Sequence, residues 1–144
     1  MRTLLALSFV LAFALPGISA ADQAVRFNQV EVHYNAVATD FLSPQVAKSY
    51  GITRSHYRGL LTISVLADQA KGAPQAVAAK VSAYRVNMAD QLANIDMREV
   101  KEAHAIYYLG TFHISRPETL TFHVNVTPHG KTQAYQVKFT RDFD

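Results

Sequence analysis

The chain contains no cysteine, and this absence removes several kinds of chemistry at once. Disulfide bonds, thiolate metal ligands, a cysteine nucleophile and a lipid-modified cysteine are all excluded. Tryptophan is also absent, and the 144 residues include only six glycines. There is no glycine-rich phosphate-binding loop, no G-x-S-x-G motif and no H-E-x-x-H motif. The sequence therefore favours a protein that is not an enzyme and holds no cofactor.

Charge of either sign is sparse. Lys and Arg total 14 and Asp and Glu total 11, which gives a net charge of +3 without a run of like charges. So weak an excess does not indicate a nucleic-acid-binding surface. With 49% hydrophobic and 17% charged residues, the composition is that of a globular protein rather than a disordered one.

The longest apolar run is short and lies near the start of the chain. Arg2 precedes an uncharged run of about a dozen residues that begins at Leu4, whereas a membrane-spanning helix needs roughly 20. Proline, glycine and several small residues follow the run. This order is typical of a cleaved secretory signal peptide, which we predict over residues 1–21, with cleavage after Ala20 or Ala21. We therefore expect export to the periplasm without a membrane anchor.

Alternation of apolar and polar residues is the main pattern after this leader, and it is typical of strands with one buried face. The alternating runs are residues 30–36, 61–65, 77–83, 95–101, 106–114, 120–126 and 135–139. A short helix is predicted between the first two strands. Ser43 suits its N-cap, Pro44 its first helical position and Gly51 its end.

Residues 22–144 are therefore predicted to form a single all-β domain. The strand spacing favours an antiparallel immunoglobulin-like β-sandwich of about seven strands, with one short helix between the first two strands. A small closed barrel is the alternative. The long connection around the helix is the best candidate for a functional loop, because loops carry a large share of binding residues.

Several short segments also carry a resemblance to a known family. They are EVHYNA at 31–36, FLSP at 41–44, YGI at 50–52, RSHYRGL at 54–60, ISVL at 63–66, REV at 98–100 and AIYY at 105–108. In order and spacing the chain resembles the bacterial periplasmic family catalogued as domain of unknown function 4426. The resemblance implies a small periplasmic protein of Gram-negative bacteria. It implies no activity, cofactor or catalytic residue.

The most distinctive candidate site is a basic segment. If the strand of residues 61–65 extends backwards, Arg54, His56 and Arg58 share its outward face at intervals of about 7 Å. Such a stripe suits a small anion or an acidic sugar, and Tyr50 and Tyr57 would add stacking surface. The alternative is a solvated strand face that is paired with glutamates elsewhere. The glutamates considered are Glu31, Glu99 and Glu102.

Two further groups of residues suggest sites. His113 and His123 flank the turn at Pro117 and would lie opposite each other if their strands pair. With His33 they would make a three-histidine metal site; the alternative is three unrelated surface histidines. Tyr107 and Leu109 fall on the outward face of an otherwise apolar strand. They are either an interaction patch or residues packed under a neighbouring loop. The candidate metal ligands are thus His33, His113 and His123. The candidate interaction patch is Tyr107 and Leu109.

Three hypotheses of function follow. The first is a non-enzymatic interaction or accessory module of the cell envelope that uses residues 40–58 and the strand around Tyr107. The second is a small-anion or sugar-binding domain centred on the basic segment. The third is a metal-dependent hydrolase built on the three histidines. An acid–base site at Glu99, Lys101, Glu102 and His104 is disfavoured, because catalytic carboxylates need burial or a like-charged neighbour, and this run approaches a turn.

Overall fold

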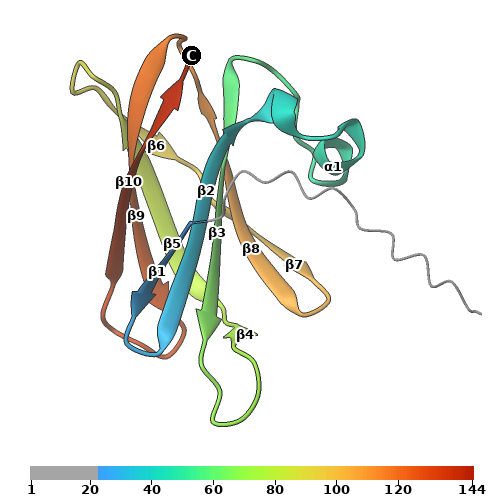
Figure 1. The fold of residues 1–144 in the computed structure, drawn as a ribbon, viewed down its shortest axis with the longest axis vertical. Coiled ribbons are helices and arrows are strands. Elements are labelled where there is room, and N and C mark those ends of the chain that lie inside the picture. The colour runs from blue at the N-terminus through green and yellow to red at the C-terminus, as the bar shows by residue number, and fades with distance from the viewer. Residues whose placement is uncertain (1–22) are drawn as a thin grey trace, which may run out of the picture.

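Ten strands form along residues 23–144, the part of the chain that the computed structural model describes, and they make two antiparallel sheets (Figure 1). The predicted signal peptide lies outside the described residues. The first sheet has the order β1-β2-β3-β8-β7, with β4 paired to β3. Its strands are β1 (Gln23–Phe27), β2 (Val30–Ala38), β3 (Arg58–Ala67), β4 (Gln75–Ala76), β7 (Arg98–Glu102) and β8 (Ala105–His113).

The second sheet has the order β10-β9-β5-β6. Its strands are β5 (Ala79–Val86), β6 (Leu92–Ile95), β9 (Glu118–Pro128) and β10 (Tyr135–Phe143). Between β2 and β3 lie a 3-10 turn, η1 (Thr39–Phe41), and a helix, α1 (Pro44–Ser49). Within residues 23–144 no helix is long and apolar enough to cross a membrane.

One main core fills the space between the two sheets. Leu61 and Ile63 of β3 and Phe122 of β9 are each 0% exposed and belong to the same cluster. The rings of Phe112, from the first sheet, and Phe122, from the second, meet at 5.0 Å. Each fully buried side chain of this size contributes about 1.5–3 kcal/mol. Because the chain has no disulfide, this packing has to stabilise the fold.

The prediction of an antiparallel all-β protein is confirmed, and so is the helix. Ser43 Oγ accepts a hydrogen bond from Val46 N at 3.1 Å, Pro44 opens α1, and Gly51 follows it with φ 65°. The predicted number of about seven strands is wrong. β1 and the two-residue β4 lack a clear alternating signal. The run at 95–101 divides at Asp96 into β6 and β7, which belong to different sheets.

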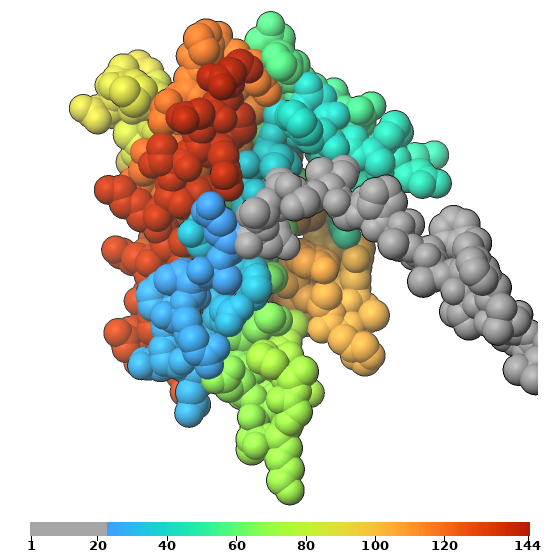
Figure 2. All heavy atoms as spheres, in the orientation of Figure 1, coloured from blue at the N-terminus to red at the C-terminus, as the bar shows by residue number. Residues whose placement is uncertain are grey.

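The short length of β1 leaves part of β2 without a second neighbour. β1 pairs with β2 only from Val30 to Tyr34, whereas β3 pairs with β2 along its whole length to Ala38. In the described part of the chain, residues 35–38 therefore have β3 on one side and no strand on the other. We call residues 35–38 the open edge. In the space-filling view, the end of β10 in dark red and the η1–α1 segment in cyan flank this part of β2 (Figure 2).

Candidate functional site

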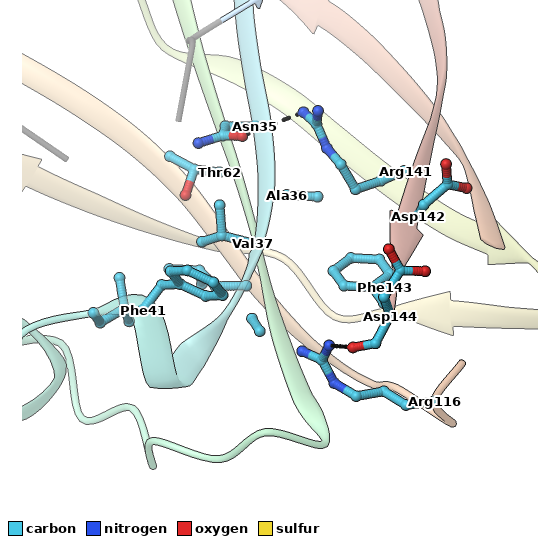
Figure 3. A pocket seen from close by; sticks show the side chains of 13 residues that line it. Asn35, Ala36, Val37, Phe41, Thr62, Arg116, Arg141, Asp142, Phe143 and Asp144 are labelled. Atoms are coloured by element: carbon cyan, nitrogen blue, oxygen red, sulfur yellow. Dashed lines mark hydrogen bonds between the residues drawn. The ribbon is translucent and has the colours of Figure 1, made fainter. Parts of the chain in front are cut away.

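A cleft of about 640 Å³ surrounds the open edge, between β2 and β10. Its walls come from η1, β2, β3, the turn before β9 and the end of β10 (Figure 3). The apolar lining residues are Ala36, Val37, Ala38, Phe41, Leu42, Leu60 and Phe143. The polar and charged ones are Asn35, Thr62, Arg116, Arg141, Asp142 and Asp144.

Apolar surface lies on both sides of the open edge. Ala36 and Ala38 are buried toward the core, beside Phe143 of β10, whereas Val37 is only half-buried on the opposite face of the strand. Figure 3 shows Val37 and Phe41 on one side of β2 and Phe143 on the other. Phe41 is 64% exposed, so its ring is available to a ligand. Alternate side chains of a bound extended segment would therefore meet apolar surface on either face.

The β2–β3 register determines which main-chain N–H and C=O groups of the open edge face β3 and which face outward. Asp68 N donates to Gln29 O at 2.9 Å, so Gln29 and Asp68 form a hydrogen-bonded pair. Such pairs alternate along an antiparallel ladder. In the observed register, Asn35 and Val37 thus direct their N–H and C=O groups to β3. Ala36 and Ala38 direct theirs outward, and no backbone hydrogen bond from the described residues reaches them there.

Arg141 is the least engaged cation of the cleft. Its Nη2 donates to Asn35 Oδ1 at a long 3.4 Å, and its Cζ lies 6.0 Å from the centroid of the Phe139 ring. Its Nε is buried and has no hydrogen-bond partner among the described residues. No carboxylate of residues 23–144 forms an ion pair with it.

Two other charged side chains of the cleft, Arg116 and Asp142, are engaged. Arg116 donates from Nε to His56 O at 2.7 Å and from Nη1 to Asp144 O. Asp142 accepts a hydrogen bond from Thr119 Oγ1 at 2.7 Å. These contacts connect the turn before β9 and the end of β10 to their neighbours. Arg116 and Asp142 are therefore held by the protein itself.

The prediction of a basic stripe at Arg54, His56 and Arg58 is wrong. β3 begins only at Arg58, because a turn at residues 56–57 interrupts the extended chain, with Arg58 N donating to Ser55 O at 3.4 Å. Arg54 Nη2 instead donates to Asp40 O at 2.9 Å, and His56 Nδ1 lies 3.0 Å from Asp40 Oδ2. Both side chains thus tie the loop to η1, and neither pairs with the glutamates considered above.

The two tyrosines assigned to this stripe lie apart from each other. Tyr57 is 57% exposed and meets the His56 ring edge-on at 5.5 Å. It lines a small hollow with Arg58 and His113. Tyr50, at the end of α1, packs on the second apolar cluster. Partial burial raises the pKa of the Tyr50 phenol above its ordinary value, and the Glu102 carboxylate raises it further.

The predicted interaction patch at Tyr107 and Leu109 is wrong for Leu109. Leu109 is 5% exposed and packs with Ala47 of α1, Ile52 and Leu60. The α1 segment therefore covers this face of β8, as the alternative interpretation expected. Tyr107 is half-buried at the margin of that cluster. It also lines a second hollow of about 670 Å³, together with His33.

The three candidate metal-binding histidines do not meet. His113 is in β8 of the first sheet and His123 is in β9 of the second, so the expectation that they lie opposite each other is wrong. The His123 ring stacks on Tyr84 at 4.6 Å, while His33 lies beside Glu31 on β2. Residues 23–144 contain no group of three or more His, Cys, Asp or Glu side chains placed to hold a metal ion.

Reasoning from the sequence missed the cleft and Arg141. One signal was present: the alternation of β10 continues past Phe139 to Phe143, with Val137, Phe139 and Phe143 buried, and Arg141 occupies an inward position in that series. A cation at a core position of a strand indicates either a buried ion pair or a site. The open edge itself had no sequence signal, because it depends on where β1 stops pairing.

Comparison with solved structures supports the observed fold. A DUF4426 family protein from Pseudomonas aeruginosa PAO1 is 33% identical, with a TM-score of 0.70, over 84% of this chain and 93% of that one. FetP from uropathogenic Escherichia coli strain F11, in a copper-bound variant and as isolated, has TM-scores of 0.61 and 0.60 at 10% identity. These matches cover 85% of this chain and 95% and 93% of theirs, and at that identity they show the fold alone.

Comparison of the sequence with protein families assigns the chain to one of them. No curated protein matches the chain significantly. The model of one family matches residues 24–144, which is nearly all of the described chain, and that family is described as a domain of unknown function. The resemblance seen in the short sequence segments is thereby confirmed: the chain belongs to the DUF4426 family.

Proposed function

We propose that this protein is a non-enzymatic interaction module of the cell envelope that binds an extended peptide segment of a partner along the open edge. The observation that carries the proposal is an uncharged strand edge whose outward main-chain groups, at Ala36 and Ala38, have no partner within residues 23–144. A peptide that pairs with such an edge gains main-chain hydrogen bonds, and pockets for its side chains give specificity.

Among the other edge strands, β1, β7 and β10 carry charges, whereas β6 (LANI) is uncharged but only four residues long. Natural proteins place charged residues on exposed edges to prevent association with other chains. β7 reads REVKE, β10 carries Lys138 and Asp142, and β1 carries Arg26. The open edge reads NAVA and carries no charge. An unprotected edge with apolar surface on both faces is what a peptide-binding strand requires.

The cellular location belongs to the same proposal. The predicted leader would export the protein, and its lack of cysteine makes folding independent of the redox state outside the cytoplasm. FetP, which shares the fold, was expressed in the periplasm of Escherichia coli. We further propose that the two facing sheets are an immunoglobulin-like sandwich. We do not propose a copper site in this chain, because residues 23–144 contain no group of three or more His, Cys, Asp or Glu side chains placed to hold a metal ion.

The anion- or sugar-binding alternative has less support. Arg54 and His56 are both engaged with Asp40, so only Arg58 of the three basic residues is without such a contact among the described residues. Exposed basic side chains of this kind contribute little to binding on their own. The cleft around the open edge offers more buried surface and a defined main-chain geometry.

The test uses residues 22–144, the chain that the predicted cleavage after Ala21 would leave. A random heptapeptide library is selected on the folded protein, and an enriched peptide is titrated against wild type and Ala36→Pro. Proline at this position removes an outward N–H without removing a bond to β3, and proline is tolerated on strand edges. We expect the Kd to rise at least about tenfold, which corresponds to one lost hydrogen bond.

The matched control is Ala24→Pro. Ala24 lies next to the hydrogen-bonded residues of β1, so its N–H points to the outer side of that strand, away from the cleft. Its Kd should equal that of wild type, and circular dichroism should show that both variants fold. Equal affinity for wild type and Ala36→Pro would contradict the proposal, as would failure to enrich any peptide.

A further inference from the structure

We infer that Arg141 selects partner segments that carry a carboxylate, an assignment that rests on the proposed function. The residue occupies an inward position of β10, between the buried rings of Phe139 and Phe143. A hydrophobic residue there would continue the pattern of the strand. The position instead holds a cation that is half removed from water.

The guanidinium has vacant donors. Arginine presents five N–H groups. The structure records one long contact, to the neutral amide of Asn35, and a buried Nε without a partner within residues 23–144. Leaving a buried charge unpaired is unfavourable, and a carboxylate that binds with both oxygens satisfies two donors together. An incoming acidic group would therefore be recognised strongly.

The place of Arg141 relative to the open edge fits this role. Its contact residue, Asn35, directly precedes Ala36, where the outward main-chain groups begin. Figure 3 shows Asn35 and Arg141 facing each other at one end of the cleft, with Arg116 and Asp144 at the other end. A strand paired with Ala36 and Ala38 would pass beside the guanidinium. A Glu or Asp side chain at one position of that strand would then reach it.

The other charges of the cleft do not replace this contact. Arg116 is committed to two main-chain oxygens, and Asp142 is held by Thr119. Asp144 lies at the far end, where it would disfavour an acidic group of the ligand (Figure 3). Among the charged side chains that line the cleft, Arg141 is therefore the cation left to bind an anion.

The test compares the same heptapeptide selection on wild type, Arg141→Met and the control Lys138→Met, which removes a charge from an exposed position of the same strand. We expect Asp or Glu at one fixed position of peptides enriched on wild type and on the control, and no such preference on Arg141→Met. Replacing that Glu with Gln in one peptide should weaken its binding to wild type about tenfold or more. Binding to Arg141→Met should not change.

The outcomes separate this inference from the proposed function. Peptides that bind wild type without an acidic preference, yet lose affinity in Ala36→Pro, would overturn the role of Arg141 and leave edge binding intact. An equal loss on Glu-to-Gln replacement in wild type and Arg141→Met would also overturn it. Peptides whose affinity does not respond to Ala36→Pro would instead refute the edge site itself.

Discussion

Arg141 shows how a single residue can depart from an otherwise regular pattern. Three of its neighbours at the same parity, Val137, Phe139 and Phe143, are 4%, 8% and 5% exposed. The pattern alone predicts an apolar residue at this position. Sites for binding commonly depart from what stability favours, and the arginine is such a departure. Measuring how Arg141 affects stability without a ligand therefore tests whether the residue serves the structure or a binding site.

The variant Arg141→Met should not destabilise the free protein. Methionine removes a partly desolvated charge and fills the apolar neighbourhood, so we expect the free energy of unfolding to be unchanged or to rise by about 0.5–2 kcal/mol. Urea denaturation followed by circular dichroism measures it, with Lys138→Met as the control that should show no change. A loss above about 1 kcal/mol would mean that the arginine serves the structure.

Elements with strong local signals were predictable from the sequence, and those that depend on distant partners were not. The long alternating strands and the capped helix α1 occur where their residues indicate. The segment from Arg54 to Tyr57 was misread as a strand, because a turn anchored by Ser55 and Asp40 overrides its alternation. Local periodicity cannot detect a contact made sixteen residues away.

The position of α1 explains why Leu109 is not a surface residue. The helix and the following Ile52 cover the outer face of β8, so Leu109 joins a second apolar cluster. We predict that Leu109→Ala lowers the free energy of unfolding by about 2–5 kcal/mol, the usual range for a buried leucine. The control Leu92→Ala removes a side chain that is 59% exposed and should cost less than about 0.5 kcal/mol. Comparable small losses in both variants would show that α1 does not cover β8.

At the scale of the whole molecule, the division of strands between two sheets decides which residues can meet. His113 and His123 flank one short turn, yet the chain crosses from one sheet to the other there, and their rings separate. No periodicity in the sequence records this crossing. The same holds for the open edge, which arises because β1 ends its pairing at Tyr34 while β2 continues to Ala38. Composition and alternation thus predicted the fold class, but not the site.

The open edge has a direct signature in amide hydrogen exchange. In the protein that begins at Asp22, the amides of Ala36 and Ala38 point outward and should exchange quickly, while those of Asn35 and Val37 are bonded to β3 and should exchange slowly. Addition of a selected peptide should slow exchange at Ala36 and Ala38 and leave the other two unchanged. Rapid exchange at Ala36 and Ala38 that persists when the peptide is bound would contradict edge binding, and slow exchange there without peptide would contradict the open edge itself.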